Sequence, residues 1–130
     1  MENKRNEATI NRPEGDRVLD APYVFGDIEE AIRQLKEEEA WAKNDRNAIT
    51  LFKSDHVTIV LTCLHEKAAI NQNSVDGELT LQLIEGKITV ETADGDIEMK
   101  PGQFLSFHRR IDHSIKATDD AVLLLTVFKP

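Results

Sequence analysis

The chain has 130 residues, which is enough for one domain and too few for two ordinary ones. Its 24 acidic and 16 basic residues give a formal net charge of −8 at pH 7. Nucleic acids and anionic membranes bind basic surfaces, so this charge argues against both as partners. The single cysteine, Cys63, excludes an internal disulfide framework and a cysteine-rich zinc site.

No targeting or membrane segment is expected in this chain. Residues 1–20 lack the apolar stretch that a secretory signal contains. The longest apolar run, 121–127, is far shorter than the ~20 residues that span a bilayer. We therefore expect a cytoplasmic protein that does not associate with membranes.

Residues 1–45 are expected to form a flexible arm followed by one helix. The arm is polar and charged up to about Asp20, a composition typical of a mobile segment. Asp27 followed three residues later by Glu30 is a capping-box pattern, which predicts a helix that ends near Trp41. Its apolar residues have helical spacing: Ile28, Ala31, Ile32 and Leu35. Trp41 is expected to be a packing anchor.

From residue 46 onward, short β-like runs replace the helical pattern. Eight runs rich in Val, Ile, Leu, Thr and Phe are separated by turn residues, namely 47–52, 56–64, 78–85, 87–92, 97–100, 103–107, 113–117 and 121–128. Eight short strands with no helix between them do not form a parallel α/β sheet. The pattern predicts an antiparallel β-sandwich or jelly-roll barrel over residues 46–130.

The spacing of residues 67–86 is informative. Gly86 closes a turn after Leu83-Ile84-Glu85, as the last glycine of the motif G-x5-H-x-H-x3-E-x6-G does. With Gly86 in that place, the two histidine positions are Asn73 and Val75, and the glutamate position is Leu79. A second motif, G-x5-P-x-G-x2-H-x3-N, begins at Gly102.

In the second motif His108 stands at the proline, Arg110 at the inner glycine and His113 at the histidine. Both motifs are those of cupins, and residues 47–128 resemble a small single-domain bacterial cupin. The resemblance implies an all-β, cupin-type antiparallel jelly-roll β-barrel at residues 46–130, preceded by one N-terminal α-helix. Because cupins of this size commonly pair, it also implies a homodimer, for which the apolar side of the helix and Trp41 would be suitable.

The resemblance also implies where a metal would be held, because in cupins three histidines and one carboxylate of the motifs coordinate it. Only His113 remains of those four. Val75 and Leu79 have no lone pairs to donate, and Asn73 offers only a neutral amide oxygen, a poor ligand for transition metals. Such sites need at least three good donors, so we expect no metal and no cofactor here.

The interior is instead expected to be apolar, because Leu79, Leu81 and Leu83 alternate onto one face of their strand. The predicted function is that of a non-catalytic, metal-free barrel with no catalytic residues, which is either structural or binds a mostly apolar small molecule. The candidate ligand-binding residues are His113, Asn73, His108 and Arg110.

Each candidate also has a structural interpretation. His113 can be hydrogen-bonded to the backbone or to Asp112, Asn73 can belong to a turn over residues 71–74, and His108 to Arg110 can be a solvated loop tip paired with Asp112 or Asp119. Cys63 lies within a strand with no base placed beside it, which favours a buried structural thiol.

Two other functions remain open. One is a metal-dependent cupin enzyme, of dioxygenase or isomerase type, with unconventional ligands around His108 and His113. The two arginines between them would repel a cation. The other is a sensor module whose basic loop binds an acidic partner.

Overall fold

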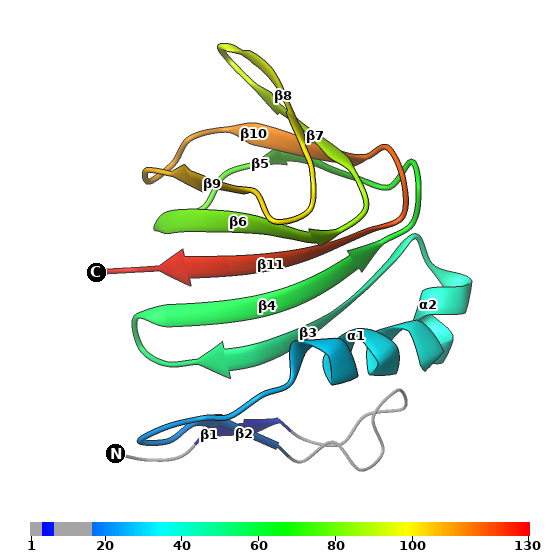
Figure 1. The fold of residues 1–130 in the computed structure, drawn as a ribbon. Helices are drawn as coiled ribbons and strands as arrows, with labels where there is room; N and C mark the ends of the chain where they lie inside the picture. The colour runs from blue at the N-terminus through cyan, green and yellow to red at the C-terminus, as the bar shows by residue number, and fades with distance from the viewer. Residues whose placement is uncertain (1–3, 7–16) are drawn as a thin grey trace.

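Two antiparallel sheets face each other in the computed structural model, which describes residues 4–6 and 17–130 (Figure 1). The five-stranded sheet has the order β3-β4-β11-β6-β9, and the four-stranded sheet has the order β5-β10-β7-β8. The strands are β3 (Arg46–Lys53), β4 (Val57–Leu64), β5 (Ala69–Asn73), β6 (Glu78–Glu85), β7 (Ile88–Thr92), β8 (Gly95–Met99), β9 (Phe104–Phe107), β10 (His113–Ala117) and β11 (Ala121–Phe128).

The barrel core lies between these sheets and follows from the alternation of side chains along the strands. Leu79, Leu81 and Leu83 of β6 are buried, whereas Gln82 on the opposite face is exposed. Leu81 and Leu83 pack with inward-facing residues of both sheets, among them Leu123 of β11. The predicted all-β architecture and the inward direction of these leucines are therefore confirmed, and each of the eight predicted runs corresponds to a strand.

Strand β5 was not predicted from the sequence. Asn73 was expected in a turn, but it ends β5, where its Cα pairs with that of His113 in β10. Asparagine and glutamine have low strand propensity, so residues 71–73 resemble a loop when taken alone. Pairing with β10 overrides this local preference, because Ile70 lies opposite Ile115 and packs on the barrel core.

The helical segment is interrupted where one continuous helix was expected. Helix α1 (Ile28–Glu37) begins as predicted, because the Glu30 backbone N–H donates a hydrogen bond to Oδ1 of Asp27 at 3.1 Å. Glu38 then adopts an extended backbone, and a short second helix, α2 (Glu39–Lys43), follows. The expectation of a single helix is therefore corrected.

A buried polar contact fixes the chain at this break. Asn47 Nδ2 donates to the carboxylate of Glu38 and to the backbone oxygen of Leu35, each at 2.9 Å. The second bond satisfies a carbonyl near the C-terminal end of α1, where intrahelical donors run out. The extended conformation of Glu38 therefore attaches the end of α1 to the first barrel strand.

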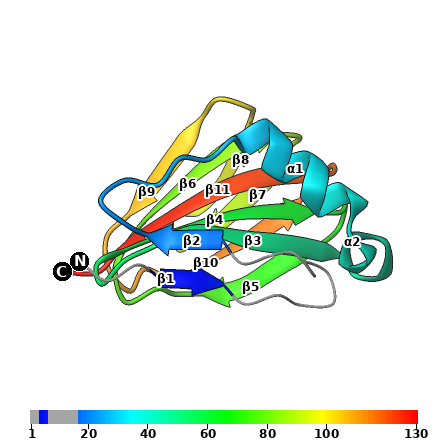
Figure 2. The same ribbon diagram turned by 90° about the horizontal axis from the view of Figure 1, so that it is seen from below.

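Helix α1 lies across the outer face of the five-stranded sheet and creates a second apolar cluster (Figure 2). Ile32 and Leu35 pack against Leu61 and Val122 of the sheet, and Trp41 packs against the same cluster. The apolar side of the helix and Trp41 are thus occupied within the chain. The homodimer, and the surface that would form its interface, stay predictions.

The predicted arm contains a small sheet of its own. Strand β1 (Lys4–Asn6) pairs antiparallel with β2 (Arg17–Asp20), and β2 lies against β3 (Figure 2). Residues 1–3 and 7–16 of the arm lie outside the described residues. None of the helices in the described ranges is long and apolar enough to cross a membrane.

Candidate functional site

His113 begins strand β10 and points into the barrel. Only 3% of its surface is exposed, because the alternation of β10 turns His113, Ile115 and Ala117 toward the core. Its ring stacks on that of Phe107, the last residue of β9, with 4.4 Å between the ring centroids and 11° between the ring planes. The imidazole is therefore fixed against an aromatic wall.

The two ring nitrogens of His113 have different surroundings. Nδ1 lies 3.0 Å from the backbone oxygen of Ile111, which agrees with the backbone partner considered from the sequence. Nε2 is buried and has no hydrogen-bond partner among the described residues. A buried polar atom without a partner costs about 1–3 kcal/mol, so this nitrogen does not contribute to stability.

The other positions of the first motif lie at the same end of the barrel. Asn73 is opposite His113 across the β5–β10 pair, and Leu79 is opposite Phe107 across the β6–β9 pair. The Val75 backbone oxygen accepts a hydrogen bond from the Arg110 N–H at 3.0 Å, which joins the loop before β6 to the loop before β10. Strand pairing therefore sets Asn73 beside His113 and Leu79 beside Phe107 at this end of the barrel.

These residues do not fit the metal that cupin motifs hold. The other three ligand positions of the motifs are held by Asn73, Val75 and Leu79, of which two have hydrocarbon side chains and one has a neutral amide. Among residues 4–6 and 17–130, no three His, Cys, Asp or Glu side chains are grouped so as to hold a metal ion. The donor set therefore supplies one imidazole where at least three good donors are needed.

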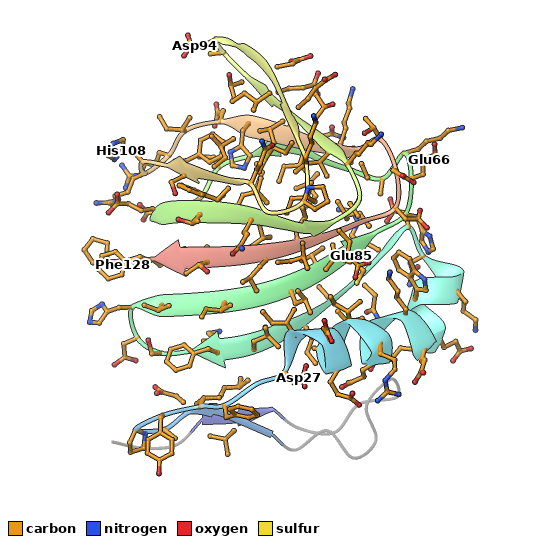
Figure 3. The ribbon with its side chains drawn as sticks, in the orientation of Figure 1. Asp27, Glu66, Glu85, Asp94, His108 and Phe128 are labelled. Carbon is orange, nitrogen blue, oxygen red and sulfur yellow. The ribbon has the colours of Figure 1, made fainter. Side chains whose placement is uncertain are left out.

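His108 does not join His113 in a common site. Its side chain is 93% exposed, and its Nδ1 lies 3.5 Å from a carboxylate oxygen of Glu78 at the protein surface. Figure 3 places His108 at the outer end of the barrel, on the same side as Phe128. The enzyme alternative requires His108 and His113 to bind one metal ion together. His113 is buried and His108 is exposed to solvent, so the two side chains lie in different environments.

A cleft of about 340 Å³ opens at this end of the barrel. Its lining residues come from β6, β9, β11 and the loop after β9, and are Glu78, Leu79, Thr80, Ser106, Phe107, His108 and Phe128. Phe107 is one of the residues that line this cleft, and its ring stacks on His113, whereas His113 itself does not line the cleft. Phe107 was not among the predicted site residues, although alternation along residues 104–107 places it inward with Leu105.

The basic loop has a different partner from the one expected. Both Arg109 and Arg110 donate to Oδ1 of Asp76, with Arg109 Nη2 at 2.7 Å and Arg110 Nε at 3.2 Å. The hydrogen bonds from Arg109 lower the pKa of the Asp76 carboxyl below its usual value. The expected pairing with Asp112 or Asp119 is therefore corrected, and the Arg110 guanidinium is engaged at the exposed loop.

The remaining histidines are structural contacts in separate places. His65 stacks on Trp41 with 3.4 Å between the ring centroids, and its Nε2 lies 2.7 Å from the Trp41 backbone oxygen. His56 Nδ1 lies 2.9 Å from the backbone oxygen of Lys129. Trp41 is thus confirmed as a packing anchor, here between α2 and the barrel.

Cys63 should be chemically inert in the native protein. The thiol is fully buried, and this burial raises its pKa to about 11. We expect a disulfide-exchange reagent at pH 8 to leave the native thiol unmodified and to label it stoichiometrically in denaturant, because the thiolate is the reactive form. Since the folded pKa exceeds the unfolded value of about 8.5, stability should fall as pH rises from about 8.5 toward 11. Rapid labelling of native protein at pH 8 would contradict this expectation.

Comparison with solved structures identifies the fold, whereas no family model and no curated protein sequence matches the chain. A cupin superfamily protein from Desulfitobacterium hafniense is 18% identical, with 67% of this chain and 80% of that one covered, at a TM-score of 0.65. A protein containing a cupin-2 domain from Shewanella frigidimarina is 9% identical, with coverage of 79% and 93% and a TM-score of 0.64. KdgF from Halomonas sp. is 12% identical, with coverage of 66% and 82% and a TM-score of 0.60. The chain therefore has the cupin fold, an antiparallel jelly-roll barrel.

Proposed function

We propose that this chain is a non-catalytic cupin-fold barrel that binds a small, mostly apolar molecule through one polar contact with His113. The observation that carries the proposal is the buried Nε2 of His113, which has no partner among the described residues. Because such an atom opposes folding, its presence in a well-packed interior is better explained by binding than by stability.

The surroundings of His113 support a ligand that is apolar except at one point. Phe107 covers one face of the imidazole, and Leu79 lies opposite Phe107 on the neighbouring strand. The cleft of about 340 Å³ lies at the small end of the range for ligand pockets, ~300–1,000 Å³. A molecule of the size of one substituted ring would enter at this end of the barrel and meet Nε2 at the edge of the imidazole, with the Phe107 ring kept against the imidazole face.

Replacing His113 tests whether it serves binding or folding. His113→Phe keeps an aromatic ring against Phe107 and removes both nitrogens. It loses the bond to Ile111, about 1 kcal/mol, but also removes the unpartnered Nε2, so we expect the free energy of unfolding to change by less than about 1 kcal/mol. Binding of phenol as a probe, followed by NMR titration, should weaken at least ~10-fold.

A second variant separates the two nitrogens. The His113→Asn amide can still donate to the Ile111 oxygen but places nothing at Nε2, so it should also lose phenol binding. A loss of several kcal/mol in both variants, measured by urea unfolding, would assign His113 to the fold instead. Elemental analysis of protein purified without chelators completes the test, because near-stoichiometric iron, zinc, manganese or nickel would support the enzyme alternative.

A further inference from the structure

The hydrogen bond of His113 determines the chemistry that its free nitrogen can offer. The partner of Nδ1 is the backbone oxygen of Ile111 at 3.0 Å, and a carbonyl oxygen only accepts hydrogen bonds. Nδ1 must therefore carry a proton. In a neutral imidazole the other nitrogen, Nε2, is then an acceptor with an in-plane lone pair.

His113 is buried without a charged partner in the described part of the chain. The side chain is buried, and no carboxylate among the described residues forms an ion pair with it. Burying an unpaired imidazolium would require the loss of its hydration with no compensating charge. Inside the barrel His113 therefore presents a lone pair and not an N–H group.

The ring cannot easily exchange the roles of its nitrogens. Turning the imidazole over would break the Nδ1 bond to Ile111 and place a carbon atom against that carbonyl oxygen. Phe107 lies nearly parallel to the ring, at 4.4 Å between centroids, and so restricts its rotation. The acceptor at Nε2 is consequently preorganised and approachable only along the edge of the ring.

We infer that the ligand of this barrel is a hydrogen-bond donor, an apolar molecule carrying one hydroxyl or N–H group such as an alcohol, a phenol or an indole. This inference rests on the proposed binding function and narrows it. Carboxylates, ketones and ethers offer only hydrogen-bond acceptors, whose lone pairs would be repelled by the lone pair of Nε2. The nearby Arg110 does not offset this repulsion for an anion, because its guanidinium is already bound to Asp76 at the surface.

Three probes of similar size test the inference on the intact chain. Phenol is a donor, toluene is its isostere without the hydroxyl, and benzaldehyde is an acceptor only. We expect phenol to bind at least ~10-fold more tightly than toluene and benzaldehyde, and this difference to vanish in His113→Phe. Binding should be located by shifts of the His113 and Phe107 NMR signals. A second cleft, beside α1, is lined by Tyr23 and Phe25, and signals from these residues control for binding there.

The outcomes distinguish a failure of the donor requirement from a failure of the proposed binding function. If all three probes shift His113 equally, the barrel binds ligands but the donor requirement is wrong. If none shifts His113 or Phe107, the proposed binding function itself fails. A measurement without ligand gives an independent check, because long-range ¹H–¹⁵N correlation should show a protonated Nδ1 and an unprotonated Nε2. The opposite assignment would overturn the inference.

Discussion

The triple variant Asn73→His, Val75→His and Leu79→Glu should bind Zn²⁺ with a micromolar or lower dissociation constant. That affinity corresponds to a binding free energy of about 8 kcal/mol. The natural chain should bind zinc far more weakly, because it has only one good donor at these positions. The expectation follows from the strand pairing, which sets Asn73 opposite His113 and Leu79 opposite Phe107. Isothermal titration calorimetry measures the affinity, and the melting temperature should rise on addition of zinc because the metal binds the folded state.

Two controls show whether the four side chains converge. Placing the glutamate at Thr80 instead of Leu79 keeps the three added ligand groups but turns the carboxylate to the outer face, so affinity should fall sharply. Adding His113→Phe to the triple variant should have a similar effect, because it removes one nitrogen donor. A folded triple variant with no gain in zinc affinity would show that the motif positions do not meet around His113.

Gly86→Ala should destabilise the protein by roughly 3–5 kcal/mol, among the largest effects of a single methyl group. Gly86 has a φ of +85°, which strains any residue with a Cβ atom. An added Cβ would also lie 1.9 Å from the backbone oxygen of Asp120, in the turn before β11. Neither backbone can move without disturbing a barrel strand, and urea unfolding should record the loss.

Gly102 provides the matched control for this substitution. Its φ of +90° is similar, but a Cβ there would meet no atom within 4 Å. Gly102→Ala should therefore cost only the backbone strain, about 1–2 kcal/mol. Equal losses at the two glycines would mean that the close approach to Asp120 does not contribute.

The sequence was most informative where local pattern and tertiary packing agree. The strands rich in Val, Ile and Leu, such as β6 and β11, were predicted within about one residue, because alternation reports which face is buried. The capping bond of Asp27 was predicted for the same reason, since both partners lie within one helical turn. Strand β5 was missed because its pairing with β10 depends on a residue 40 positions away, with His113 opposite Asn73.

The candidate site could be predicted only as a set of positions. Motif spacing selected His113 and Asn73, which the structure places opposite each other. Motif spacing could not show that Phe107 covers the imidazole, nor that Arg109 and Arg110 both donate hydrogen bonds to Asp76. Those contacts arise from loop geometry. The protonated nitrogen of His113 depends on one backbone oxygen, which no spacing rule identifies.

The two apolar clusters lie on opposite faces of the five-stranded sheet. Strands β4 and β11 send alternate side chains into both, with Leu123 facing the barrel and Val122 facing α1. Changes in the two layers are screened from each other by the sheet between them, so their free-energy effects should be nearly additive. Substitutions in the barrel lining around His113 could therefore change which ligand binds, while the apolar cluster beneath α1 continues to stabilise the fold.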